Sequence, residues 1–131
     1  MHDRYNDMFE IFKIRYFGHQ PAAIITDKTL DKIIRRDYGD NFKEVTEKLS
    51  TIKSDSPKGR NRLAAAVLRL SNGDLAKIDS YIDKCNYDYR DIVMQAEYPR
   101  SSKLGFDKTT SDKSKQIYLD DWTDYANWLN Q

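Results

Sequence analysis

Apolar residues in this chain recur with the period of an α-helix. In the stretch RNRLAAAVLRLSNG they fall at i, i+3, i+4 and i+7, on Leu63, Ala66, Val67 and Leu70. Such spacing lines one face of a helix, whereas a half-buried strand would alternate apolar and polar residues. Alternation is almost absent, and residues 22–26, AAIIT, are the only short strand candidate. The pattern therefore predicts an all-α fold.

Turn and capping residues divide the chain into about six or seven short helices. The expected helices cover residues 4–17, 26–39, 41–53, 60–73, 74–87, 88–98 and 116–131. Asp27 or Thr29 is expected to cap the second of these, and Gly39 to end it. The polar stretch KSDSPKG, residues 53–59, has the composition of a turn. With 131 residues, the chain suits one helical domain spanning residues 1–131.

A short join links the helices on either side of residues 72–74. Asn72 and Gly73 form a typical helix C-cap, and Asp74 is suited to cap the next helix. A connection this short holds two helices side by side. We therefore expect a helical hairpin here.

The C-terminal third combines a polar segment with an aromatic helix. Residues 100–115 are lysine-rich and contain few apolar residues, which predicts a mobile loop. Helical spacing then joins four large side chains, Tyr118, Trp122, Tyr125 and Leu129. This pattern predicts a helix over residues 116–131 that holds to the rest of the protein by its aromatic face. Its three aspartates, Asp120, Asp121 and Asp124, are expected on the solvated face, because they lack the spacing of a calcium loop.

Composition and charge exclude several classes of protein. The net charge of +1 makes the whole molecule a poor match for nucleic acid or an anionic membrane. One cysteine, Cys85, excludes an internal disulfide and favours a reducing, cytoplasmic setting. The first residues do not resemble a signal peptide, and no apolar run is long enough to cross a membrane.

The stretch DYRDIVMQAEYPR, residues 88–100, gathers charges at both ends of one expected helix. Asp88 is placed to cap its first turn, and Arg90 to bridge Asp91 or an acid on the preceding helix. Glu97 lies near the carbonyl end, where a negative charge needs an external partner such as Arg60 or Arg62. A carboxylate pair for acid–base catalysis is the alternative. We expect the capping and ion-pair interpretation, because such charges are usually structural.

Recognisable catalytic and metal-binding patterns are missing from the sequence. The two histidines, His2 and His19, have no partner at ligand spacing, and the glycines are isolated. Cys85 falls on the apolar face of its helix, which favours a buried, inert thiol. We therefore expect no metal, no cofactor and no catalytic residue, and we predict that the protein is not an enzyme.

The run LAAAVLRLSNGDLAKIDSYIDKCNYDYRDIVMQAEYPR resembles a signature of small bacterial proteins of uncharacterised function. Its features are a helix that ends in a Gly-Asp step, an Arg-Asp pair and the sequence Ala-Glu-Tyr-Pro. The resemblance covers residues 63–100 and implies an intracellular bacterial protein with a helical fold. It carries no activity and no catalytic residue. By analogy, small helical proteins of this kind resemble immunity or antitoxin-type partners.

These observations predict a protein that acts through contact with another protein, with opposite charges steering the encounter. The expected contact region joins the basic start of helix 57–70 to the end of helix 88–98, through Arg60, Arg62, Arg90, Glu97, Tyr98 and Arg100.

Nucleic-acid binding is the alternative function, because the start of helix 57–70 is basic. The residues expected to contact phosphate are Lys58, Arg60, Arg62, Lys103 and Lys108.

Overall fold

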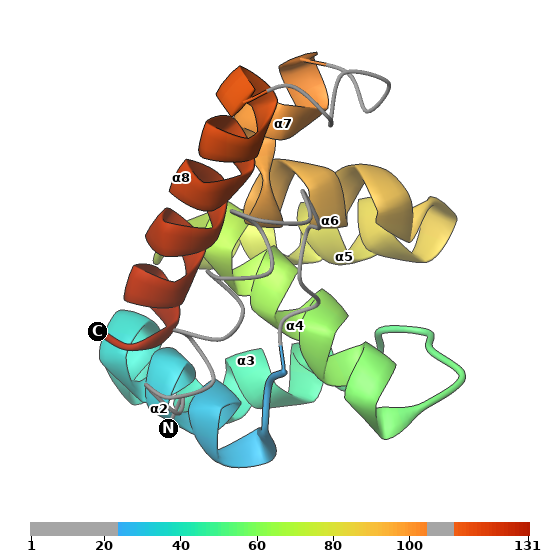
Figure 1. Ribbon diagram of the computed structural model, residues 1–131. Coiled ribbons are helices and arrows are strands. Elements are labelled where there is room, and N and C mark those ends of the chain that lie inside the picture. Colours follow the sequence, from blue (N-terminus) through green and yellow to red (C-terminus); the bar gives the residue numbers. More distant parts are fainter. Residues whose placement is uncertain (1–23, 105–111) are drawn as a thin grey trace. The chain divides into compact units, whose positions relative to one another are not determined.

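The computed structural model describes residues 24–104 and 112–131, and all regular structure within these two ranges is helical (Figure 1). The helices are α2 (Asp27–Tyr38), α3 (Phe42–Leu49), α4 (Pro57–Ser71), α5 (Leu75–Tyr87), α6 (Tyr89–Glu97), α7 (Pro99–Leu104) and α8 (Asp112–Leu129), with a 3-10 turn η1 (Gly39–Asn41). The predicted all-α class is confirmed, and Ile24–Thr26 do not form a strand. The helix predicted over residues 4–17 and the two histidines lie outside the described residues.

The chain forms two compact units. One consists of Ile24–Ala96, and Glu97–Gln131 belong to the other. In the first unit, α2 packs against α3 and α4, and α5 packs against α3 and α4. The core of this unit is formed by apolar side chains that are at most 8% exposed: Ile25, Ile33, Ile34, Tyr38, Val45, Leu49, Ile52, Leu63, Ala64, Ala65, Ala66, Val67, Leu68, Ile78, Ile82, Cys85, Ile92, Val93 and Ala96.

Helix α2 is capped one residue earlier than expected. The side chain of Thr26 accepts a hydrogen bond from the backbone N–H of Thr29 at 3.1 Å. The prediction that Asp27 or Thr29 caps this helix is wrong, because Asp27 is already helical and Thr29 supplies the N–H that the cap satisfies. Gly39 ends the helix as predicted, with φ of 48°. That region of φ favours glycine, which has no Cβ.

Helix α4 begins at Pro57, which is the start of the predicted helix 57–70 and lies inside the segment predicted as a turn. Ser56 is its N-cap and accepts a hydrogen bond from the N–H of Gly59 at 3.0 Å. Pro57 takes the first helical position, where the N–H that proline lacks would have had no helical partner. The turn prediction is therefore wrong for residues 57–59. The side chain of Asn61 donates to the carbonyl of Ile25 at 3.1 Å, which ties α4 to the start of α2.

The predicted hairpin joint between α4 and α5 is confirmed in its details. Asn72 adopts the left-handed conformation, with φ of 50°, and Gly73 follows with φ of 79°. The carboxylate of Asp74 then caps α5 by accepting from the N–H of Ala76 at 3.0 Å. The two helices pack against each other. The three consecutive alanines, residues 64–66, are buried, and their small side chains permit close approach of a neighbouring helix.

The segment predicted as a loop over residues 100–115 is helical at both ends. Pro99 ends α6 as predicted, but it also occupies the first position of α7. Helix α8 begins at Asp112, so the loop boundaries were wrong on both sides. Residues 105–111 lie outside the described residues. The polar composition of this segment concealed two helix ends, since serine, lysine and aspartate also suit helix termini.

A carboxylate from α8 caps the first turn of α7. Asp121 accepts hydrogen bonds from the backbone N–H groups of Arg100 at 3.3 Å and Ser101 at 2.9 Å. The Ser101 hydroxyl at 2.8 Å and Nη1 of Arg100 at 3.1 Å also donate to it. Asp121 is 1% exposed, so the prediction that it lies on a solvated face is wrong. A buried carboxylate is stable here because its oxygens accept several hydrogen bonds and a positive charge lies beside it.

The aromatic face predicted for the C-terminal helix is present on α8. Tyr118, Trp122, Tyr125 and Leu129 are all buried, and so is Trp128. The rings of Tyr125 and Trp128 stack with their centroids 5.6 Å apart.

Among the described residues, no helix combines the length and the apolar composition that crossing a bilayer would require.

Replacing the buried carboxylate should destabilise the α7–α8 pair. In Asp121→Ala the free energy of unfolding should fall by about 3 kcal/mol, because two backbone N–H groups lose their acceptor and Arg100 loses a buried partner. Urea unfolding followed by tryptophan fluorescence measures this loss, since both tryptophans, Trp122 and Trp128, lie on α8.

Asp124→Ala is the matched control. Asp124 pairs with the same arginine, at 2.6 Å from its Nη2, but is about half exposed. Its loss should lower the free energy of unfolding by at most about 1 kcal/mol. Equal effects of the two substitutions would contradict a capping role for Asp121.

Candidate functional site

The six residues predicted as a contact region divide between the two units. Arg60, Arg62 and Arg90 belong to the Ile24–Ala96 unit, and Glu97, Tyr98 and Arg100 to the other. In the first unit, Arg60 is exposed in the first turn of α4, and Arg62, two residues later, is half-buried.

Two of the predicted contact residues are engaged within the protein. Glu97 is 3% exposed, which is a correction to its expected place on a contact surface. The guanidinium of Arg100 is about half exposed but bonds to Asp121 and Asp124. Neither arrangement could be predicted from the sequence, because local charge does not reveal burial or a partner some twenty positions away.

The junction between α5 and α6 is a single residue, Asp88. Its N–H donates to the carbonyl of Lys84 at 2.9 Å and so closes α5. Its carboxylate accepts from the backbone N–H of Arg90 at 3.1 Å, which caps α6 as the sequence predicts. One residue therefore ends one helix and starts the next.

Asp88 also binds the side chain of Arg90. The guanidinium donates through Nε to Oδ1 at 3.0 Å and through Nη2 to Oδ2 at 3.1 Å, a bidentate pair. The expectation that Arg90 bridges Asp91 or the preceding helix is therefore wrong, since its partner lies two residues before it. The Arg90 side chain, followed by its backbone N–H, lowers the pKa of the Asp88 carboxyl, and the same contact raises the pKa of Arg90.

Two tyrosines flank Asp88 and are exposed to solvent. Tyr87 is 93% exposed and Tyr89 is 55% exposed. Tyr89 is therefore not buried with the apolar residues Ile92 and Val93 of the same helix. Tyr89 is the first residue of α6, ahead of the turns that pack, so its ring is not carried into the core. The sequence feature that could have identified these exposed side chains is a pair of tyrosines on either side of a helix-capping aspartate.

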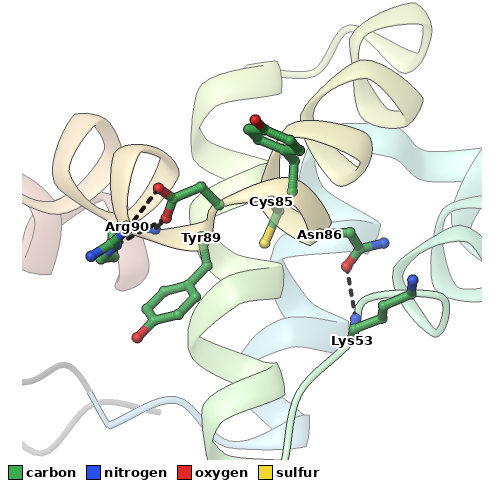
Figure 2. Close-up of a pocket in the computed structure, with 7 residues that line it drawn as sticks. Lys53, Cys85, Asn86, Tyr89 and Arg90 are labelled. Atoms are coloured by element: carbon green, nitrogen blue, oxygen red, sulfur yellow. Dashed lines mark hydrogen bonds and ion pairs between the residues drawn. The ribbon is translucent and has the colours of Figure 1, made fainter.

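A pocket of about 460 Å³ opens at this junction (Figure 2). Its lining consists of Lys53, Cys85, Asn86, Tyr87, Asp88, Tyr89 and Arg90. We call the exposed side chains of Tyr87, Tyr89 and Arg90 the junction surface. The pocket lies wholly within the Ile24–Ala96 unit, and of the six predicted contact residues it includes Arg90.

Asn86 attaches the α3–α4 loop to the wall of the pocket. Its Oδ1 accepts from the backbone N–H of Lys53 at 2.8 Å, and its Nδ2 donates to the carbonyl of Thr51 at 3.3 Å. Figure 2 shows Lys53 beside Asn86, with the sulfur of Cys85 pointing away from them. These two bonds hold the start of the loop at the C-terminal end of α5, so Lys53 has a defined position at the pocket.

The ionisable groups in the lining of this pocket are a thiol, a carboxylate, two tyrosine hydroxyls and two cations. Cys85 is buried, and burial raises the pKa of its thiol, which favours the unreactive protonated form. Asp88 is the one carboxylate in the lining, and Asp91 and Glu97 are not part of it. Within residues 24–104 and 112–131, no three histidine, cysteine or acidic side chains come together in a way that could hold a metal ion.

No protein-family model, curated protein or solved structure matches this chain.

Protonation of Asp88 should depend on Arg90. The carboxyl should titrate below the ordinary value of 3.8, because Arg90 favours its charged form. In Arg90→Ala its pKa should rise but stay below that value, since alanine keeps the backbone N–H. The pKa of Asp88 can be followed by side-chain carboxyl NMR from about pH 6 to about pH 2.

The same shift determines how the contact stabilises the fold. Because the folded pKa is lower than the unfolded one, the contribution is fully present above the unfolded pKa. It is lost as the pH falls through the folded pKa. Arg35→Ala, on α2, is the control and should leave Asp88 unchanged. An Asp88 pKa that is the same in wild type and Arg90→Ala would contradict the ion pair.

Proposed function

We propose that this protein is non-enzymatic and acts by binding another protein through the junction surface. The observation that carries the proposal is the exposure of Tyr87 and Tyr89 next to Arg90. Tyrosine and arginine are among the residues that supply most of the binding energy in protein interfaces. A tyrosine ring offers a large contact area at a low cost in conformational entropy, and its hydroxyl can bond to a partner.

The position of Arg90 supports the same proposal. Its side chain is 73% exposed, yet Asp88 holds its guanidinium through two hydrogen bonds. An exposed arginine held in this way loses less conformational entropy on binding than a free one. Arg90 belongs to the contact region predicted from the sequence, and Tyr87 and Tyr89 extend that region across the α5–α6 junction.

The proposal also includes the cellular setting of the protein and the class of protein to which it is analogous. A single cysteine, buried and without a disulfide partner, fits a reducing, cytoplasmic setting. The resemblance of residues 63–100 to small bacterial proteins fits a bacterial origin. Immunity and antitoxin-type proteins, which neutralise a toxin by covering it, are one concrete class that works in this way.

Nucleic-acid binding is the second candidate function, and the start of α4 supports it. Lys58 and Arg60 are exposed in its first turn, which contains no acid. Backbone N–H groups at such a position favour phosphate. Lys103 is exposed on α7, and Lys108 lies outside the described residues. The net charge of +1 argues for the first candidate, because non-specific affinity for nucleic acid depends on positive charge.

The tyrosines should be required for capture of a partner. A tagged full chain, expressed in cells of the source organism, should co-purify a protein that Tyr87→Ala/Tyr89→Ala retains at least about tenfold less well, as expected for loss of two interface anchors. Quantitative mass spectrometry of the purified complexes measures this difference, and circular dichroism checks that the variant remains helical.

Ile24→Ala is the matched control, because Ile24 is also a large exposed apolar residue, at 57%, in the same unit. It should retain the partner. A partner held equally by the wild type and the double tyrosine variant would contradict the proposal. Nuclease-sensitive retention that falls steeply between about 50 and about 200 mM salt would favour nucleic-acid binding instead.

A further inference from the structure

The pocket at the α5–α6 junction contains one positive charge that the protein does not match. Lys53 is exposed, and its ammonium forms no ion pair with any residue in the part of the chain that the structure describes. The other cation in the lining, Arg90, is paired with Asp88, and Asp91 adds a second carboxylate near it. The unmatched positive charge of the lining therefore lies on Lys53.

The lining also contains hydrogen-bond donors that are not bonded to any acceptor of the lining. A lysine ammonium has three N–H groups, and each tyrosine hydroxyl has one O–H. Within the described ranges, no protein group bonds to the hydroxyls of Tyr87 and Tyr89. A group that only accepts hydrogen bonds and carries a negative charge is complementary to such a surface, and an ionised carboxylate meets both conditions.

The segment that follows Lys53 has the same sign of charge. Residues 53–60 contain Lys53, Lys58 and Arg60 against one acid, Asp55, and all four side chains are exposed. Exposed charges of one sign raise the rate at which an oppositely charged partner arrives. The α3–α4 loop would therefore attract an acidic partner toward the pocket to which Asn86 attaches it.

We infer that the junction pocket receives an acidic side chain of the partner protein, with its carboxylate on the ammonium of Lys53 and its neighbouring residues on Tyr87 and Tyr89. The charge of the site favours a carboxylate over a phosphate group. One unmatched lysine balances a single negative charge, whereas a phosphate dianion would leave one negative charge unbalanced in a lining that also contains Asp88. This inference rests on the proposed function and adds the chemistry of the partner to it.

The probes are two short peptides that differ only in charge. Acetyl-Glu-Leu-Glu-Leu-Glu-amide and acetyl-Gln-Leu-Gln-Leu-Gln-amide are titrated, each at the same ionic strength, into the full chain labelled with ¹⁵N. The glutamate peptide should shift the backbone resonances of Lys53 and of residues 86–90 in a saturable way, and the glutamine peptide should bind at least about threefold more weakly. Inorganic phosphate is a third probe and should not reproduce the shifts.

Lys53→Gln should weaken binding of the glutamate peptide at least about threefold, whereas Lys77→Gln should not change it. Lys77 is also exposed and lies on α5, but it is not part of the pocket. The backbone spectrum of each variant, recorded without peptide, shows whether the fold is intact.

Equal binding of the two peptides, or no shift at the junction with either, would overturn the inference. The same holds if phosphate reproduces the shifts, or if Lys53→Gln binds the glutamate peptide as the wild type does. These results are distinct from a failure of the proposed function. If the proposed function is wrong, the double tyrosine variant keeps its partner. If only the inference about the acidic side chain is wrong, Lys53→Gln binds the glutamate peptide as the wild type does, while the tyrosines remain necessary for capture of the partner.

Discussion

The junction between α5 and α6 depends on the carboxylate of Asp88. The backbone N–H of this residue closes α5, and its side chain caps α6 and binds the guanidinium of Arg90. Tyr87 is the last residue of α5 and Tyr89 the first of α6, and both side chains are exposed on either side of this cap. The shape of the surface and the charge beside it therefore have the same origin, a helix cap with a bidentate arginine.

Local signals in the sequence were sufficient for much of the Ile24–Ala96 unit. The spacing of Leu63, Ala66 and Val67 identified the buried face of α4, and Asn72-Gly73 with Asp74 identified the joint that follows it. These features depend on residues within one or two turns of each other, so a sequence pattern contains them. Errors at helix starts have the same local origin, since Thr26, Asp27 and Thr29 are all suitable caps and only the backbone determines which one is used.

Contacts between residues far apart in the chain were not predicted from the sequence. Asp121 caps a helix that begins some twenty residues earlier, and its neighbour Asp120 has the same side chain but is exposed. Charge alone does not distinguish these two aspartates, because the difference is the presence of α7 beside one of them. The pocket was missed for a similar reason. Lys53 and Asn86 are 33 positions apart, and their hydrogen bond exists only because α3 packs against α5. Of the candidate site, the sequence identified Asp88 and Arg90, which lie two positions apart in the chain.

The attachment of Lys53 to Asn86 separates two parts of the α3–α4 loop. Up to residue 53 the backbone is held against α5, whereas Ser54, Asp55 and Ser56 bond to nothing outside their own turn and the start of α4 among the described residues. Extra residues introduced after position 54 would lengthen the turn without moving the lysine. Related proteins could therefore differ in length at this point and still present the same ammonium to a ligand, and the turn offers a place to attach a fluorophore near the pocket.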